Sequence, residues 1–403
     1  LLLPLILWPW LARVLGPAQA GLLAMTEAAA RYVALGVEYG FQLSATRDIA
    51  RCAADRQRRA RVVSAVISGQ LLLAAAAALL TALLWLLLPA LKPHPGLVLS
   101  ALVWGVALGA TPVWHFQGLE RMRFAAAADA GFRLAAVAAI LLTVRDARSA
   151  WLAPALHASA AAAACALCWR RVLRESGAGA IGLSGGVAEL RRSFPVFLFR
   201  AAVSLYTTGN VLLLGLLGRA EMAGLFAAAE KLVKAAVSVI YPISQAMYPR
   251  VARLLEAGGG LARLAVLRSL RLTMAIGLLA GLTLAAAAAP LVRFLFGPGF
   301  EPAAPLVATL SLLAPLIAAS NVLGLQWMLP NRMERSMNAA LAAAAAVNVL
   351  LAWVLVPRFG AQGMAWAVVA AEASVTAGVV ASLARAGRLP WIDLSKREEL
   401  VSC

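Results

Sequence analysis

The sequence predicts an all-α protein that crosses a membrane about twelve times, and three observations carry this prediction. Hydrophobic residues make up 63% of the 403 residues, charged residues only 13%, and the mean hydropathy is +0.84. Apolar runs long enough to cross a hydrocarbon layer of ~30 Å recur along the whole chain. Short polar segments rich in arginine separate these runs. Together these features are typical of a polytopic membrane protein and not of a soluble domain.

Twelve apolar segments are candidates for the membrane-spanning helices. In chain order they are residues 1–15, 21–44, 62–88, 97–114, 125–144, 151–169, 195–217, 223–247, 272–296, 302–329, 337–356 and 362–384. We expect the first helix to be truncated, because the chain begins at Leu1 already inside an apolar run. The fifth and sixth segments give the weakest signal because they consist largely of alanine.

Basic residues are distributed unequally between the two sides of the predicted membrane. The loops on one side hold 26 of the 36 lysines and arginines, those on the other side hold seven, and three lie within spans. Because cytoplasmic loops carry the excess of basic residues, we expect the first side and both chain termini to be cytoplasmic. This bias also accounts for the net charge of +18 without a nucleic-acid partner, since the arginines are not gathered on one face.

A polar, glycine-rich stretch in the middle of the chain divides the spans into six and six. We therefore expect an N-terminal six-helix bundle at residues 1–172 and a cytoplasmic linker at 173–194. A C-terminal six-helix bundle at 195–384 and a cytoplasmic tail at 385–403 complete the predicted organisation.

An internal repeat supports this division into two pseudo-symmetric halves. The stretch that starts at Gly21 aligns without gaps with the stretch that starts at Gly224. The aligned pairs are Gly21 with Gly224, Glu27 with Glu230, Arg31 with Lys234, Gln42 with Gln245, and Arg47 with Arg250. Both copies enter the membrane from the same side, which predicts an axis along the membrane normal. Such repeats are typical of transporters that rock two halves about a central cleft.

The repeat places charge near the middle of two predicted spans. A helix rise of about 1.5 Å per residue puts Arg31 and Lys234 roughly 15 Å below the outer ends of their spans. An ionised side chain there costs roughly 2.5–3.5 kcal/mol on insertion scales. Each cation follows a carboxylate by four residues, Glu27 and Glu230, which is the favourable order on one helix face. We interpret the two cations as a site for phosphate or pyrophosphate, and the alternative is that each pair only neutralises itself.

Other embedded polar residues are candidates for coupling and for sugar binding. Glu38 and Glu372 are candidates for coupling to an ion gradient by protonation, whereas Arg200 is expected to snorkel and Asp129–Arg133 to neutralise itself. The residues that could hydrogen-bond a sugar are Tyr39, Gln42, Tyr206, Asn210, Gln245 and Asn321. Contacts between helices are the commoner role for polar residues of this kind.

The sequence offers no sign of an enzyme, a metal site or a cofactor. None of the four lysines follows a G-x-x-x-x-G pattern, so ATP is not the expected direct fuel. The three histidines show no metal-ligand spacing, and no Ser/His/Asp grouping stands out. Cys165 and Cys168 form a C-x-x-C on an apolar helix, where packing is the favoured interpretation.

Several stretches resemble the bacterial Wzx-type polysaccharide flippases, in the same order along the chain. They are LPLILWPWLARVLGPAQAGLLA, EYGFQLSATRDIAR, SLYTTGNVLLLGLL, FAAAEKLVKAA, PISQAMYPRV, LFGPGFEPAAPLV and SNVLGLQWMLPNRMER. The resemblance implies a MATE-like fold of the MOP superfamily that moves undecaprenyl-pyrophosphate-linked oligosaccharide, the O-antigen repeat unit of lipopolysaccharide, across the bacterial inner membrane. It implies ion-gradient coupling and a substrate-anion role for Arg31 and Lys234. The implied partners are this substrate, membrane lipids, and the polysaccharide polymerase with its assembly machinery.

Three other functions remain open from the sequence. A MATE-type drug exporter shares the fold but needs a cleft dominated by carboxylates, whereas here acids and bases roughly balance. A lipid II flippase of the MurJ type normally has fourteen spans. A non-transporting scaffold for glycan assembly would leave the embedded charge pairs with a purely structural role.

Overall fold

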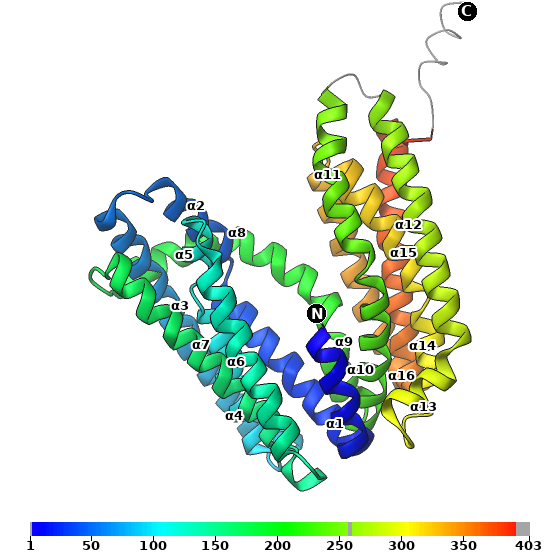
Figure 1. Ribbon diagram of the computed structural model, residues 1–403, viewed down its shortest axis with the longest axis horizontal. Helices are drawn as coiled ribbons and strands as arrows, with labels where there is room; N and C mark the ends of the chain where they lie inside the picture. Colours follow the sequence, from blue (N-terminus) through cyan, green and yellow to red (C-terminus); the bar gives the residue numbers. More distant parts are fainter. Residues whose placement is uncertain (1, 257–259, 392–403) are drawn as a thin grey trace, which may run out of the picture. The chain divides into compact units, whose positions relative to one another are not determined.

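The computed structural model describes residues 2–256 and 260–391, and these residues form helices without a strand, which confirms the predicted all-α class (Figure 1). The chain divides into two compact units, Leu1–Ser204 and Leu205–Cys403. The predicted boundaries at 172 and 195 stay a prediction. Helix α8 (Leu183–Thr208) begins inside the predicted linker and continues into the predicted seventh span.

The described part of the first unit, from residue 2 onward, contains ten helical elements, of which the last continues four residues past Ser204. They are α1 (Leu2–Glu38), α2 (Phe41–Arg51), α3 (Arg56–Leu87), η1 (Pro89–Leu91), α4 (Pro95–Ala110), α5 (Val113–Gly118), α6 (Met122–Thr143), η2 (Ala147–Ser149), α7 (Leu152–Ser176) and α8. Helix α4 packs against both α1 and α7, and α6 packs against α7. Two glycines allow α4 to approach α1 closely, because a Cβ at Gly105 or Gly109 would lie 2.5 Å from a carbonyl oxygen of α1.

Helix α1 joins the first two predicted spans across a kink. Gly16 interrupts the helix with φ 72° and ψ 172°, a conformation that glycine adopts at little cost, and Pro17 follows it. At its other end α1 stops at Glu38, and Tyr39 and Gly40 both have positive φ before α2 begins. The predicted second span, residues 21–44, is therefore broken near its C-terminal end.

The described residues of the second unit, up to residue 391 and without 257–259, form nine helical elements. They are α9 (Asn210–Leu217), α10 (Ala220–Val237), α11 (Ile240–Glu256), α12 (Gly260–Ala286), α13 (Ala288–Phe296), α14 (Ala303–Leu310), α15 (Leu313–Ser320), the π-helical η3 (Asn321–Met328) and α16 (Glu334–Arg385). Helix α12 packs on α15, and α10 packs on α14. Glycines again permit the approach, since a Cβ at Gly277 or Gly281 would lie 2.8 or 2.9 Å from a carbonyl oxygen at the start of α15 or just before it. Helix α16 kinks at Gly360, three residues after Pro357, and thereby joins the last two predicted spans.

Eight helices of the described chain are long and apolar enough to cross a membrane. Glu334–Arg385 contains the last two predicted spans, and Ile6–Arg51 contains the second together with residues 6–15 of the first. The seventh and eighth predicted spans are not among the eight. A bend at Gly209 interrupts the seventh, a turn at residues 238–239 interrupts the eighth, and α10 carries four charged residues. The number of twelve crossings stays a prediction.

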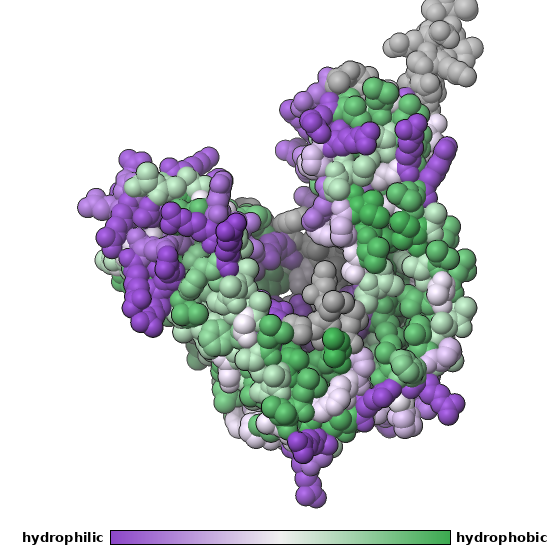
Figure 2. Space-filling model, in the orientation of Figure 1, coloured by the Kyte–Doolittle hydropathy of each residue, from purple (hydrophilic) through white to green (hydrophobic). Residues whose placement is uncertain are grey.

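The surface of each unit is apolar along its flank and polar at its ends (Figure 2). Helix α3 shows this most clearly, because Leu79, Leu83 and Leu87 are 73%, 51% and 65% exposed. Such a row of exposed leucines on a helix of 32 residues is expected to face lipid. The structure thus supports the prediction of a polytopic membrane protein.

Candidate functional site

The predicted charge pair of the first unit forms on α1. Arg31 Nη2 donates a hydrogen bond to Glu27 Oε1 at 2.8 Å. The Arg31 side chain is 61% exposed, whereas that of Glu27 is 24% exposed. The carboxylate therefore lies against the protein and holds the guanidinium toward accessible space. A guanidinium exposed within an apolar span requires a polar or hydrated surrounding.

The second unit repeats this arrangement on α10. Lys234 Nζ lies 3.0 Å from Glu230 Oε1, and the two side chains are 59% and 14% exposed. The preceding turns of α10 are closely packed, since all residues from Ala223 to Ala229 are buried. The charged pair thus begins where the buried alanine-rich segment ends.

The two pairs agree in acceptor atom, spacing and exposure, although they lie in different units. In each pair a largely inaccessible carboxylate positions an accessible cation four residues later on the same helix. An anion can approach such a cation without displacing the carboxylate, because the cation can donate more than one hydrogen bond. The equivalence confirms that these positions of the repeat have the same local geometry.

Two other predicted site residues contact α8 within the first unit. Glu38 forms an ion pair with Arg200, the residue that was expected to snorkel. The Tyr39 ring stacks on Phe197 with a centroid distance of 4.4 Å and an interplanar angle of 14°. The proposed ion-coupling role of Glu38 and sugar-binding role of Tyr39 therefore compete with a structural role in packing α8.

These contacts continue along α2 and α8. Asp48 pairs with Arg192 at 2.6 Å, and the Ser44 and Ser193 hydroxyls lie 2.9 Å apart. We call the four contacts the α2–α8 clamp; it consists of Glu38–Arg200, Tyr39–Phe197, Ser44–Ser193 and Asp48–Arg192. Sequence reasoning missed the clamp, although Ser193, Phe197 and Arg200 follow one another at four and three residues on α8 and therefore share one helix face.

The carboxyl group of Glu372 lies within the second unit, on α16. The Ser320 hydroxyl donates a hydrogen bond to Glu372 Oε1 at 2.7 Å. Within residues 2–256 and 260–391, no basic side chain forms an ion pair with Glu372. A carboxyl group held by a hydroxyl and not by a cation can change protonation state without breaking an ion pair.

The remaining sugar-binding candidates each lie on a different helical element. Gln42 is half-buried on α2, Asn210 is buried at the start of α9, and Gln245 is exposed on α11. Asn321 starts the π-helical segment η3, and the side chain of Tyr206 lies outside the described side chains. Their roles in binding stay predictions.

The cysteines occupy positions that suit packing. Cys165 and Cys168 are buried on α7, and Cys168 belongs to a cluster with Phe41 and Trp114. Cys52 is half-buried at the end of α2, and Cys403 lies outside the described residues.

The helical units, their lipid-facing flanks and the embedded charge pairs define a polytopic membrane transporter with a MATE-like fold. Two solved structures share this fold. An inward-facing multidrug resistance MATE family transporter of the MOP superfamily has a TM-score of 0.72 and 14% identity, over 95% of this chain and 94% of that one. Lipid II flippase MurJ in an inward closed conformation has a TM-score of 0.76 and 12% identity, over 95% and 85%. At these identities the likeness shows the fold alone.

The chain belongs to the polysaccharide biosynthesis protein family, whose model matches residues 1–255. A protein of Escherichia coli (strain K12) named "Putative O-antigen transporter" is 31% identical over 379 residues, which cover 93% of this chain and 91% of the relative. A protein of the same name from Shigella dysenteriae is 28% identical over 368 residues, which cover 90% and 91%. The family resemblance inferred from the sequence motifs is confirmed.

Proposed function

We propose that this protein is a flippase for lipid-linked oligosaccharides. Its cargo is an undecaprenyl-pyrophosphate-linked repeat unit, which it moves from the cytoplasmic to the periplasmic leaflet of the bacterial inner membrane. The observation that carries the proposal is the matched pair of accessible cations, Arg31 and Lys234, at equivalent positions of two apolar helices. Membership in the polysaccharide biosynthesis family, with relatives named O-antigen transporters, supports the choice of cargo.

The proposed mechanism replaces the hydration of the pyrophosphate head with protein charge. An unpaired charge in hydrocarbon is costly, so the head needs cationic partners throughout its passage. Arg31 and Lys234 donate charge-assisted hydrogen bonds to phosphate oxygens, while Glu27 and Glu230 keep each cation oriented before the substrate arrives. The lipid tail stays in the bilayer, and alternating access between two halves exposes the head first to one side and then to the other.

We propose that both termini are cytoplasmic, because the loops of that side carry 26 of the 36 basic residues.

Glu372 is the proposed coupling group, because a hydroxyl and not a cation holds its carboxyl group. The polymerase and assembly machinery that use the exported repeat unit are proposed partners. No chemical step at the protein is part of this mechanism, so we do not propose an enzyme.

The exposure of the charge pairs disfavours a drug exporter of the MATE type, because the cation of each pair is more accessible than the carboxylate. Arg31 and Lys234 are 61% and 59% exposed, whereas their carboxylate partners are 24% and 14% exposed. A cationic drug would meet the wrong sign of charge at both positions. A non-transporting scaffold predicts that both pairs can be replaced without loss of export.

The proposal is tested in the native host by deleting the gene and measuring surface polysaccharide together with the cytoplasmic-leaflet pool of lipid-linked repeat unit. We expect loss at the surface and accumulation inside. Complementation with Arg31→Ala, Lys234→Ala or both is expected to leave export impaired at normal membrane levels of protein. Arg133→Ala is the matched control, because Asp129–Arg133 is also an exposed acid-first pair, at 2.9 Å. Normal export by the double variant contradicts the proposal.

A further inference from the structure

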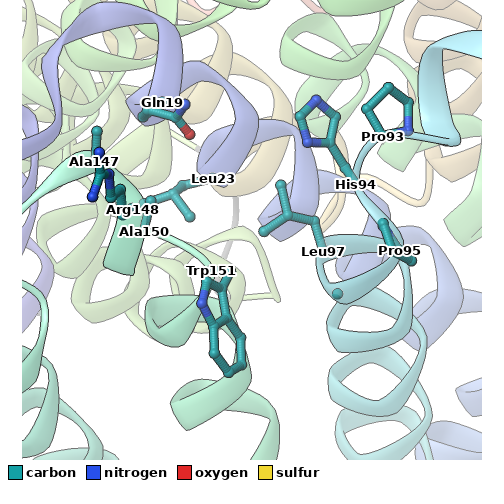
Figure 3. A pocket seen from close by; sticks show the side chains of 11 residues that line it. Gln19, Leu23, Pro93, His94, Pro95, Leu97, Ala147, Arg148, Ala150 and Trp151 are labelled. Atoms are coloured by element: carbon teal, nitrogen blue, oxygen red, sulfur yellow. The ribbon is translucent and has the colours of Figure 1, made fainter.

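The first unit contains a pocket that the charge pairs do not use. Its volume is about 410 Å³, within the range of about 300–1,000 Å³ typical of small-molecule sites. The lining residues are Gln19, Leu23, Pro93, His94, Pro95, Gly96, Leu97, Ala147, Arg148, Ala150 and Trp151. They come from α1, from the start of α4, and from η2 with the start of α7. Figure 3 shows Gln19, Leu23 and Trp151 on one side of the space, and His94 and Leu97 on the other.

The walls of this pocket are held in place by their local sequence. Pro93 and Pro95 flank His94, and Pro95 is the first residue of α4, so two fixed φ angles define the loop. On the opposite wall, Asp146 and Ser149 form a capping box around η2, with Ser149 N donating to Asp146 Oδ1 at 2.8 Å. The hydrogen bonds from Ser149 hold the pKa of Asp146 below its usual range. The Asp146 carboxylate is thus committed to its own turn and does not line the pocket.

The chemistry of the lining suits a sugar that carries a negative charge. None of the eleven lining residues is acidic, and Arg148 provides a cation beside the space. Trp151 is 52% exposed and presents an aromatic surface on which the apolar face of a sugar ring can stack. Gln19 and His94 add hydrogen-bonding groups from opposite sides.

The position of the charge gives a second, independent argument. Under the proposed topology these loops are periplasmic, where basic residues are depleted to seven of 36. Lys92, Arg145 and Arg148, three of the seven, occur in the two loops that form this pocket. A basic cluster retained against the topological bias indicates that anions are attracted to that side, and of the three residues Arg148 alone lines the pocket.

We propose that this pocket is a periplasmic binding site for a saccharide bearing an anionic substituent, such as a uronic acid. Arg148 binds the anionic group, and Trp151 stacks against the ring. The inference rests on the proposed function, because the exported repeat unit supplies the saccharide and the proposed topology places the pocket on the release side. There the site holds the sugar portion of the cargo after the pyrophosphate head has been translocated.

The test measures saccharide binding to the purified full-length protein in lipid nanodiscs by saturation-transfer NMR. The probes are methyl glucuronide, methyl glucoside and inorganic phosphate. We expect the glucuronide to bind more tightly than the glucoside, by about tenfold for one lost charge-assisted hydrogen bond. Arg148→Ala is expected to weaken glucuronide binding by a similar factor and to leave glucoside binding unchanged.

Two matched controls lie in the same unit. Arg145→Ala removes the same charge from the same loop but from outside the pocket, and Trp85→Ala removes an exposed tryptophan near the end of α3. Both controls are expected to bind as the unmodified protein does. Trp151→Phe keeps an aromatic face and is expected to bind better than Trp151→Ala, which separates stacking from a loss of folding.

Four results overturn the inference. The first is the absence of glucuronide binding, and the second is an equal loss of binding in Arg145→Ala and Arg148→Ala. The third is complete displacement by phosphate with no difference between the two sugars, which marks an anion site only. The fourth is binding that depends on phosphatidylglycerol in the nanodisc and is unaffected by Arg148→Ala, because such a signal would come from the lipid headgroups. This binding assay needs no transport. A negative result in it refutes the saccharide site, whereas normal export in the deletion strain refutes the proposed function.

Discussion

Replacing Gly40 with alanine tests the packing of α8 against the junction of α1 and α2. Gly40 has φ +84°, and an alanine in this left-handed region costs about 1–2 kcal/mol. The added Cβ would lie 2.8 Å from Val196 Cγ1 and 2.9 Å from Val196 Cβ. Forcing a methyl group into such a packed contact costs about 1–3 kcal/mol more. We therefore expect Gly40→Ala to lower the free energy of unfolding by about 2–5 kcal/mol.

Gly36→Ala is the matched control, four residues earlier on α1. It has helical backbone geometry, and a Cβ there meets no heavy atom within 4 Å, so alanine is expected to stabilise the helix by about 0.5–1 kcal/mol. The assay is thermal unfolding of the purified protein in nanodiscs, where Gly40→Ala is expected to unfold on the order of 10 °C below the control. Equal unfolding temperatures for the two variants would refute the close approach of α8 to Gly40.

Three further predictions concern charge. Glu38→Gln or Arg200→Gln removes one partner of the half-buried Glu38–Arg200 pair and is expected to lower the free energy of unfolding by about 1–3 kcal/mol, between the values for exposed and buried pairs. The double variant is expected to lose less than the sum of the two single variants, and additive losses would contradict the ion pair. Glu372→Gln keeps the Ser320 contact but cannot release a proton, so we expect normal insertion and loss of gradient-dependent export, measured in cells with a protonophore as reference. Asp55 caps α3 by accepting a hydrogen bond from Arg58 N, and this bond holds the pKa of Asp55 below its usual value. The contribution of the Asp55 carboxylate to the stability of the folded protein is therefore present above the unfolded-state pKa and is lost as the pH falls through the folded-state pKa. The unfolding temperature is therefore expected to fall more at acid pH in the unmodified protein than in Asp55→Asn, because asparagine caps the helix but does not titrate. If the unfolding temperatures of the two proteins changed in parallel with pH, this prediction would be contradicted.

Much of the fold could be predicted from the sequence because apolar runs and their breakers are local signals. The kinks at Gly16 and Gly360 fall between predicted spans, next to Pro17 and after Pro357. The break at Tyr39 and Gly40 could not be placed in the same way. Tyr39 adopts a φ of 47°, which its residue type does not favour, and its stacking on Phe197 comes from a helix more than 150 residues later.

The candidate site divides along the same line. The Glu27–Arg31 and Glu230–Lys234 pairs were predictable because a spacing of four residues is sufficient to bring the side chains together on a helix. The Glu38–Arg200 pair was not predictable, because the two residues are separated by 162 positions and nothing in either local sequence specifies the partner. The pocket beside Trp151 was missed for a related reason, since its lining comes from three separate segments.

The α2–α8 clamp has a consequence for how the gene could be divided. Residues 177–182, between α7 and α8, form no helix, so a chain cut there would lose little regular structure. The second fragment would still carry α8, whose Arg192, Ser193, Phe197 and Arg200 contact the first fragment. Two separately translated polypeptides would thus possess a built-in recognition element for reassembly. An ancestral fusion of two genes at this point would have joined partners that already recognised one another.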